Sequence, residues 1–559
     1  MCRATPILAC LLLVHVTNAE EVPKRRVEFG KSDYVAPPGL VFGGAFIDRL
    51  LPIPAEKMRS DVWGGDNVLP RNPDNGLEDS QWSYWCMDPV EPGDGLVHLF
   101  ACRWPESAPK GHMTWPNSTI VRAVAKSPLG PFKVVQEIGP GHNVMVFRTK
   151  AGAWRIYKNQ GGAECTKGYH ADSLTGDWRP DTLVFDTRGM PEENMWNLSF
   201  VERADGSVLM VSREGKIWVS PDGEAPFAKI TSATAYPPIR GSYEDPVIWQ
   251  DEVQYHMLVN DWFGRSTYYL RSRDGVEWVW DQGRALDVNI GLKRSDGSFE
   301  KWFKYERPNV RQDKTGRITH LYLASVDSLK QDDLGNDKHS SKIIVVPVAL
   351  QRRLELQPST DGEFAVLLKA EDSFNPQADL DPAGLRFGAP SAVDFGRGAA
   401  PLRTENAGSD LRLVFASKDL GFLPSDYCGK LLGRDKSGGI VHGYVRRPGE
   451  EAPAPLLSAA APKLQADGLE VEVTNFGLTR SPASTLRLRL QHGNGRAFEL
   501  ETPVAALAPY ESATVPLPLD IGRFPSGTEW AVEAHVNAPG CPALRTKSVI
   551  KIEMPEDRR

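Results

Sequence analysis

The sequence predicts an all-β chain, a five-bladed β-propeller followed by two small β-sandwich-like modules. Short strand-like runs, separated by turns rich in Gly, Pro, Asn and Asp, recur about every 50–60 residues through the first part of the chain. Repetition at such a period is typical of propeller blades. The repetition stops after Leu350, and later alternation such as Leu469-Glu470-Val471-Glu472-Val473 is typical of sandwich strands.

The propeller is expected to consist of five units, each with three or four short strands. At least four units end in an aromatic residue after a Gly- or Pro-containing turn, as in Leu174-Thr175-Gly176-Asp177-Trp178. The units are expected at residues 82–132, 144–178, 198–227, 243–278 and 306–348.

The N-terminus has the three regions of a secretory signal. Arg3 precedes an apolar run from Ile7 to Val16, and Thr17-Asn18-Ala19 supplies the small residues of a cleavage site. The run is too short to span a membrane, so a secreted or periplasmic protein without a membrane span is expected. The predicted segments are a signal peptide at 1–19, the propeller at 20–350, a β-rich module at 351–449, a Pro-rich linker at 450–462 and an immunoglobulin-like sandwich at 463–559.

Charge and cysteine usage exclude two classes of protein. The formal net charge of -7 provides no basic surface, so nucleic acid is not expected as a partner. Two of the seven cysteines lie in the predicted signal, and the five that remain are too few and too odd in number for a disulfide framework. Cys86 and Cys102 flank the turn Gly93-Asp94-Gly95 and can face each other across one hairpin, which leaves a single disulfide there as an alternative.

Polar residues stand directly before the innermost strand of each predicted unit. Because these strands converge on the central channel of a propeller, we expect the polar side chains to share one pocket. They are Asp88, Asn143, Asn197, Glu244 with Asp245, and Glu306 with Arg307. The alternative interpretation is that the acids cap strands or pair with neighbouring arginines.

Two carboxylates that face one pocket are what glycoside hydrolysis requires. Asp88 and Glu244, each close to a proline at a strand start, are the predicted catalytic pair. Crowding of acids raises the pKa of one member, which suits a general acid. The predicted substrate-binding residues are His142, Asn143, Asn197, Asp245, Glu306 and Arg307. No metal or cofactor is predicted, because the histidines and acids lack a ligand spacing.

Several motifs resemble those of glycoside hydrolase family 43 and its five-bladed relatives, which include family 117. Asp88-Pro89-Val90 with the following Asp94-Gly95-Leu96-Val97-His98-Leu99-Phe100 resembles the opening of the propeller in these families. Lys126-Ser127-Pro128-Leu129-Gly130-Pro131-Phe132 resembles their strand-end signatures, and Tyr243-Glu244-Asp245-Pro246 resembles a stretch that carries an acidic site residue. The resemblance covers roughly residues 80–350.

The resemblance implies an inverting mechanism with a base Asp, an Asp that tunes the pKa and an acid Glu. Asp88 matches the base position. The second unit has His142-Asn143 where the tuning Asp would stand, and Glu244 lies in the fourth unit rather than the third, which offers Glu192 and Glu193.

The function predicted from the sequence is an exported glycoside hydrolase that cleaves a poly- or oligosaccharide by an inverting acid/base mechanism. Two alternatives stay open at this point. One is a propeller that binds carbohydrate without catalysis, and the other is a glycosyl transferase or lyase on the same scaffold. An acid and a base in a closed pocket favour hydrolysis, whereas a shallow aromatic groove with one acid favours binding.

Overall fold

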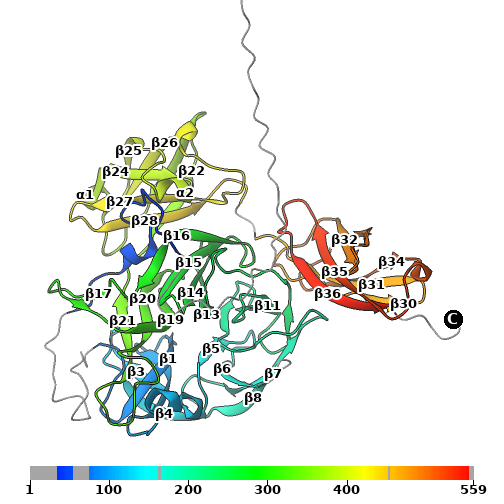
Figure 1. The fold of residues 1–559 in the computed structure, drawn as a ribbon. Helices are drawn as coiled ribbons and strands as arrows, with labels where there is room; N and C mark the ends of the chain where they lie inside the picture. Colours follow the sequence, from blue (N-terminus) through cyan, green and yellow to red (C-terminus); the bar gives the residue numbers. More distant parts are fainter. Residues whose placement is uncertain (1–33, 55–74, 162–164, 451–452, 553–559) are drawn as a thin grey trace, which may run out of the picture.

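The computed structural model describes residues 34–54, 75–161, 165–450 and 453–552, and the predicted signal peptide lies outside these ranges. Strands dominate, which confirms the predicted all-β, propeller-like fold class (Figure 1). The helices of the described ranges are short turns, and none has the length and apolar character needed to cross a membrane. They are η1 (Phe46–Arg49), η2 (Gly111–Asn117), α1 (Pro376–Asp379), α2 (Pro390–Val393), η3 (Ser417–Asp419) and η4 (Ile521–Arg523).

Within the described residues, the propeller-like part contains five groups of antiparallel strands. The first group is β1 (Trp82–Val90), β2 (Val97–Pro105), β3 (Thr119–Ala125) and β4 (Lys133–Pro140). The second is β5 (Met145–Arg148), β6 (Trp154–Gly161), β7 (Cys165–Ala171) and β8 (Arg179–Asp186). The third is β9 (Ser199–Glu202), β10 (Val208–Val211), β11 (Ile217–Ser220) and β12 (Phe227–Lys229), and its β12 pairs with β8 in parallel.

The fourth group is β13 (Tyr243–Gln250), β14 (Tyr255–Asp261), β15 (Ser266–Ser272) and β16 (Trp278–Asp287). A small hairpin, β17 (Leu292–Lys293) and β18 (Phe299–Glu300), leads to the fifth group, β19 (Lys304–Gln312), β20 (Ile318–Val326) and β21 (Ser341–Pro347).

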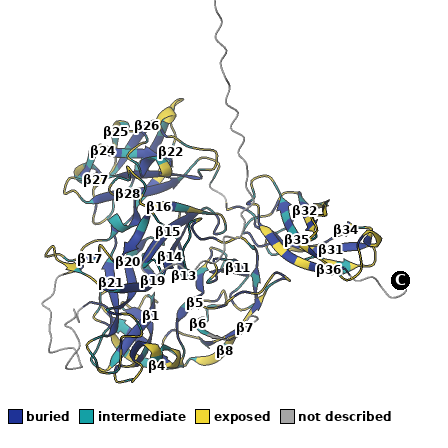
Figure 2. Cartoon of the chain, in the orientation of Figure 1, coloured by how far each residue is buried: buried dark blue, intermediate teal, exposed yellow. Residues whose placement is uncertain are grey.

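The first strands of the five groups form a closed ring. β1, β5, β9, β13 and β19 contact one another in this order, and β19 contacts β1 again. The chain just before β1 closes the ring from outside, because the amide of Leu77 donates to the carbonyl of Ile343 on β21 and the Asn75 side chain bonds the backbone of Val345. First strands lie deep in the molecule, whereas the outermost strands β4 and β8 expose alternate residues (Figure 2).

Each first strand has a residue in the left-handed backbone region, either within it or two residues before it. Apart from glycine such residues are uncommon. The five positions, here called the strand starts, are Cys86 (φ 38°), Asn143 (54°), Asn197 (54°), Asp245 (55°) and Arg307 (48°). The strand pairing shifts at Cys86, Asp245 and Arg307, so these residues are β-bulges that re-aim the side chains around them.

Cys86 and Cys102 do face each other across β1 and β2, as their spacing around the turn suggested. Their sulfur atoms lie 2.8 Å apart, and both are free thiols.

Two further parts follow the propeller and lie on different sides of it (Figure 1). The first is a seven-stranded sheet in the order β24-β27-β28-β22-β23-β26-β25. Its strands are β22 (Arg352–Gln357), β23 (Glu363–Leu368), β24 (Leu380–Gly388), β25 (Pro401–Ala407), β26 (Asp410–Ala416), β27 (Cys428–Asp435) and β28 (Ile440–Arg446).

The second part has two four-stranded sheets that share one apolar core, around Leu488 and Trp530. One sheet contains β29 (Leu457–Ala459), β30 (Lys463–Gln465), β31 (Gly468–Asn475) and β34 (Ser512–Pro518). The other contains β32 (Ser484–Gln491), β33 (Ala497–Val504), β35 (Thr528–Asn537) and β36 (Arg545–Ile552). β29 lies inside the segment that composition alone marks as a linker, because Leu457 and Ala459 are buried against β31.

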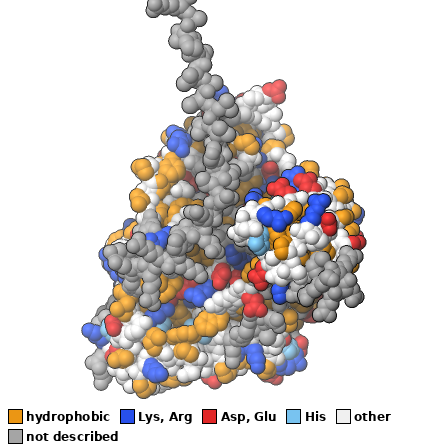
Figure 3. Space-filling view, turned by 45° about the vertical axis from the view of Figure 1, so that its right-hand side comes forward, with side chains coloured by type: hydrophobic (Ala, Val, Ile, Leu, Met, Phe, Trp, Pro, Cys, Tyr) orange, Lys and Arg blue, Asp and Glu red, His pale blue; other side chains and the backbone are white. Residues whose placement is uncertain are grey.

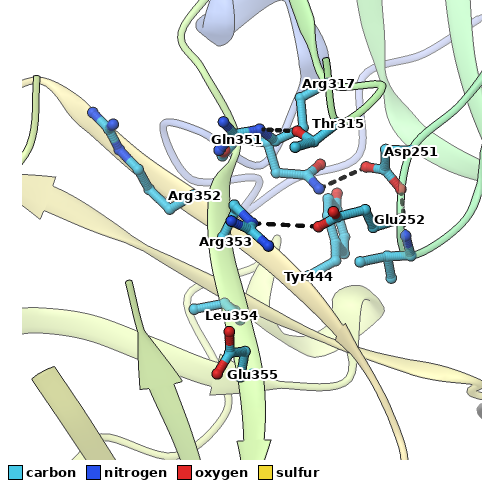
Figure 4. A pocket seen from close by; sticks show the side chains of 11 residues that line it. Asp251, Glu252, Thr315, Arg317, Gln351, Arg352, Arg353, Leu354, Glu355 and Tyr444 are labelled. Atoms are coloured by element: carbon cyan, nitrogen blue, oxygen red, sulfur yellow. Dashed lines mark hydrogen bonds and ion pairs between the residues drawn. The ribbon is translucent and has the colours of Figure 1, made fainter. Parts of the chain in front are cut away.

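Both later parts pack firmly against the propeller. Leu456, Phe476 and Leu544 belong to the same buried cluster as Met257 of β14. On the other side, Gln351 donates to Asp251 at 2.7 Å and Arg353 pairs with Glu252, around a cavity of about 50 Å³ (Figure 4). Part of the apolar surface of the C-terminal part is therefore buried against the propeller rather than within its own core.

Candidate active site

The five strand starts surround a cavity of about 250 Å³. The residue before each left-handed residue lines it in all five groups: Trp85, His142, Trp196, Glu244 and Glu306. In four groups the left-handed residue lines it too: Asn143, Asn197, Asp245 and Arg307. The bulges at Asp245 and Arg307 thus turn two successive side chains of a strand toward one space, which an ordinary strand with alternating side chains does not do.

The structure brings together all of the predicted substrate-binding residues and one of the two predicted catalytic residues. His142, Asn143, Asn197, Asp245, Glu306 and Arg307 line the cavity together with Glu244. These placements agree with the expectation that residues at the strand starts share a pocket.

Asp88 lies elsewhere. It lines a separate cavity of about 940 Å³, shared with residues such as Met145, Phe200 and Asn309. Its carboxylate accepts a hydrogen bond of 2.5 Å from the amide of Val146, and burial raises its pKa to about 7. The expected pair of Asp88 and Glu244 is therefore not formed.

The error in register has a physical cause. Asp88-Pro89 imitates Asp245-Pro246 in sequence, but the bulge of β1 is at Cys86, so Cys86 is the residue equivalent to Asp245. Pro89 lies near the end of β1 rather than at its start, which is permitted because β1 has a strand partner on one side only.

Three carboxylates meet in the cavity. Glu244, Asp245 and Glu306 each offer an oxygen atom, and these atoms all lie within 4.8 Å of one another. The three acids are thus close enough to interact directly, and repulsion between them affects their protonation.

Glu244 is the least compensated of the three acids. Its carboxylate accepts 2.9 Å from Arg213 and 3.5 Å from the Asn197 amide. Burial, followed by repulsion from Asp245 and Glu306, raises its pKa to about 8, against the opposing effect of Arg213 and Lys330. Glu244 is therefore protonated at neutral pH.

Glu306 has the opposite electrostatic state. Burial would raise its pKa, but Lys304 and Lys330 hold its two oxygen atoms and lower the pKa to about 2. The Lys330 ammonium lies 2.5 Å from the carboxylate. Glu306 is therefore ionised at neutral pH.

Asp245 is bound to Arg307. The guanidinium lies 3.0 Å from the carboxylate, and both side chains are almost completely buried. Burial opposes the charge on Arg307, yet Asp245 raises its pKa above the ordinary value. The pair is a fixed part of the cavity floor.

Aromatic rings form much of the remaining wall. Trp115 of η2 lies 4.8 Å from the ring of His142 and 6.3 Å from that of Trp196. Burial holds the pKa of His142 well below its ordinary value, so the ring is neutral and acts as a hydrogen-bonding group. Such a mixture of aromatic faces and polar groups is typical of ligand sites.

Sequence reasoning missed the residues that reach the cavity from loops. Trp115, Arg213, Trp262 and Lys330 line it, but none stands before a first strand. Arg213 comes from the β10–β11 turn and Lys330 from the connection between β20 and β21. Their place depends on contacts between distant segments, for which the sequence carries no local signal.

The remaining predicted alternative for the acid, Glu193, is a structural residue. It pairs with Lys229 at 3.0 Å and accepts a hydrogen bond from the Trp218 indole at 3.2 Å, with its side chain 1% exposed. It does not line the cavity.

Among the described residues, these three acids form the group of possible metal ligands whose oxygen atoms lie close enough together to share one cation. Their oxygen atoms, however, already bind Arg213, Arg307, Lys304 and Lys330. A metal ion would have to displace these positive groups. The arrangement therefore fits proton transfer better than metal binding.

Solved structures similar to this chain have low sequence identities and TM-scores below 0.5. No family model and no curated protein matches the chain. Among solved structures, it is similar to a family 117 glycoside hydrolase of Zobellia galactanivorans (11% identity, 52% of this chain, 90% of the other, TM-score 0.36). It is also similar to a family 43 β-1,3-galactosidase (12%, 85%, 96%, 0.35) and to a family 43 protein of Bacillus licheniformis (9%, 86%, 91%, 0.33). Both families named from the sequence motifs thus appear among these structures, while the chemistry of the site rests on its own residues.

Proposed function

We propose that the protein is a glycoside hydrolase whose proton donor is Glu244. The observation that carries this proposal is the pair of opposite protonation states in one cavity. Glu244, with a pKa of about 8, holds a proton at neutral pH, whereas Glu306, with a pKa of about 2, is charged. A protonated and an ionised carboxyl group on one site are the two components of acid-catalysed glycoside cleavage.

In this reaction Glu244 protonates the glycosidic oxygen as the bond to the anomeric carbon breaks. The positive charge that develops on the sugar ring is stabilised by the negative charge of Glu306. Arg213, which donates to Glu244, positions the acid against the leaving group.

The close spacing of the acids supports retention of the anomeric configuration. Retaining enzymes hold their two carboxyl groups about 5–5.5 Å apart, so that one attacks the anomeric carbon directly. One oxygen of Glu244 and one of Glu306 lie within 4.8 Å of each other, so no wide gap separates the two acids. Glu306 is then the second carboxylate, and Lys304 and Lys330 keep it ionised.

The shape of the cavity supports exo action. A cavity of about 250 Å³ is smaller than the range of about 300–1,000 Å³ that drug-sized ligands occupy. We propose that it holds a single terminal sugar unit, stacked on the tryptophan rings, with the rest of the glycan outside. Export, which a glycan-degrading role needs, is supported by the N-terminal signal pattern.

The test is turnover by Glu244→Gln on paired substrates. Purified protein is first screened against oligosaccharides and aryl glycosides, and the anomer released first is read by proton NMR. We expect Glu244→Gln to lower turnover of natural glycosides about 10²–10⁴-fold. Aryl glycosides with good leaving groups should lose much less, because they need little protonation.

The matched control is Glu202→Gln, which makes the same change at an exposed carboxylate of the other cavity. Equal losses on both substrate types would remove Glu244 from the acid role. Release of the inverted anomer would remove Glu306 from the role of attacking carboxylate.

A carbohydrate-binding propeller without catalysis is the alternative that the tryptophan-rich wall favours. The same screen separates the two functions. Binding of a glycan by the unmodified protein without any turnover of it would establish the binding module and exclude the hydrolase.

A further inference from the structure

We propose that the cavity takes a sugar unit with an anionic substituent, a carboxylate or a sulfate ester, and that Arg213 and Lys330 bind this substituent. The inference rests on the proposed function, because it treats the cavity as the substrate site. It adds the chemical class of the substrate, which the acids alone do not specify.

The first observation is which charged groups reach the cavity surface. The side chains of Arg213 and Lys330 are 30% and 28% exposed, while those of Asp245, Arg307 and Glu306 are between 2% and 5% exposed. A ligand that enters the cavity therefore meets two cations directly. The ionised acids Asp245 and Glu306 also line the cavity but expose much less of their side chains.

The second observation is that the buried charges already have partners. Asp245 is bound by Arg307 at 3.0 Å, and Glu306 lies between Lys304 and Lys330. Lys304 belongs to this network although it does not line the cavity. With Asp245 and Glu306 negative and Arg213, Arg307, Lys304 and Lys330 positive, the network carries two positive charges in excess whenever Glu244 is protonated.

The proposed reaction creates that state. Glu244 must carry a proton before it can act as the acid, and Arg213 then loses the negative charge that it faces at 2.9 Å. A buried site screens charge less than water does, so an uncompensated guanidinium there is costly. An anionic group on the substrate restores the balance, whereas a hydroxyl group does not.

Arg213 and Lys330 also differ in what holds them. The Lys330 ammonium lies 4.7 Å from the centre of the Trp85 ring and contacts Glu306, which fixes its position. Arg213 has one carboxylate partner and a planar group of donors, which matches the paired oxygens of a carboxylate or sulfate. We assign Arg213 the main contact and Lys330 a supporting one.

The experiment measures binding in a Glu244→Gln background, where turnover does not interfere. Isothermal titration compares D-glucuronate, D-galacturonate and D-galactose 6-sulfate with the neutral sugars D-glucose and D-galactose. At least one acidic sugar should bind about tenfold tighter than its neutral counterpart, the difference expected for hydrogen bonds to charged groups. The uronate and sulfate arms identify which anion the site prefers.

Substitution then tests the two cations. Arg213→Gln should remove most of the preference for the acidic sugar, Arg213→Lys should keep part of it, and Lys330→Gln should lower it less than Arg213→Gln. Arg148→Gln is the matched control, because Arg148 is an exposed arginine of the other cavity. It should leave the preference unchanged.

The inference is overturned if no acidic sugar binds, if acidic and neutral sugars bind equally, or if the preference survives in both Arg213→Gln and Lys330→Gln. These outcomes are distinct from failure of the hydrolase. Preference for an acidic sugar without turnover by the unmodified protein leaves the inference standing and removes the enzyme. If neutral glycosides are hydrolysed and acidic ones are neither bound tighter nor turned over faster, the inference is removed and the hydrolase stands.

Discussion

Two clusters of buried charge in this molecule have similar components and different surroundings. One is the cavity cluster of Glu244, Asp245 and Glu306 with their basic partners. The other, here called the junction cluster, lies between the fourth strand group and the seven-stranded sheet and consists of Arg49, Arg271, Asp281, Asp394 and Lys430.

In the junction cluster every acid has a fixed partner and no water-facing side. Arg271 binds Asp281 at 2.8 Å with both side chains 4% exposed, and Lys430 binds Asp394. Burial would raise the pKa of Asp281, but Arg271 holds it below its ordinary value. Burial raises the pKa of Asp394 despite its contact with Lys430. The two parts of the chain meet where the Arg271 guanidinium contacts the Cys428 sulfur at 3.6 Å.

In the cavity cluster Glu244 faces a partly exposed arginine and two other acids, and its pKa is about 8. The comparison teaches that burial alone does not mark a functional acid. Glu244 differs because nearby positive groups compensate its negative charge only in part and because it lines an open cavity. On the protein surface, by contrast, acidic and basic side chains are interspersed on the face shown in Figure 3.

The largest effect on folding is expected when the junction cluster is broken. Arg271→Met leaves Asp281 buried without its partner, which should lower the free energy of unfolding by about 3–5 kcal/mol. Urea denaturation followed by tryptophan fluorescence measures this. The double variant Arg271→Met, Asp281→Leu should recover most of the loss, and a double variant as unstable as the single one would contradict the assignment.

The pH dependence of turnover should sharpen the contrast. Glu244 acts as an acid only while protonated, so kcat/KM for natural glycosides should fall about tenfold per pH unit above pH 8. Glu306, with a pKa of about 2, adds no acid limb before the protein unfolds. A pH–rate profile from 5 to 10 measures this, and a midpoint near 5 would argue against Glu244.

The free energy of unfolding should also depend on the protonation of Glu244, with a smaller effect than that on turnover. The folded protein keeps the Glu244 proton between pH 4.5, the ordinary pKa, and about 8, whereas the unfolded chain has released it. The folded state then binds more protons, so stability falls as pH rises through this window. Glu244→Gln removes this dependence of stability on pH. Between pH 5 and 8, the free energy of unfolding of the variant should rise by about 1–3 kcal/mol relative to that of the unmodified protein.

The smallest effect is expected at Asp88. Asp88→Asn changes a carboxylate that lines the other cavity, so turnover should stay within about twofold of the unmodified protein. Steady-state kinetics on the same glycoside measure it. A loss as large as that of Glu244→Gln would restore the pairing that the sequence motifs indicate.

The repeating strand pattern was sufficient to predict the fold class, and seven of the eight residues that it singled out lie together in the cavity, because polar residues before apolar runs are a local signal. Asp88 failed because a bulge at Cys86 shifts the register, and a one-residue insertion leaves no mark in composition. Arg213, Lys330, Trp115 and Trp262 come from turns and connections whose place depends on tertiary packing. Part of the segment predicted as a linker forms β29, where Leu457 is buried beside β31.

The left-handed residues at the five strand starts have a consequence for how such a site can change. Cys, Asn, Asp and Arg all adopt the same backbone conformation there, at φ between 38° and 55°. Since unrelated side chains accept it, the surrounding ring imposes the kink, and the residue itself does not create it. We therefore expect a carboxylate to be tolerated at any of these five positions, because the backbone there already accepts four different residue types. A point substitution would then place an acid on another strand group of the same ring.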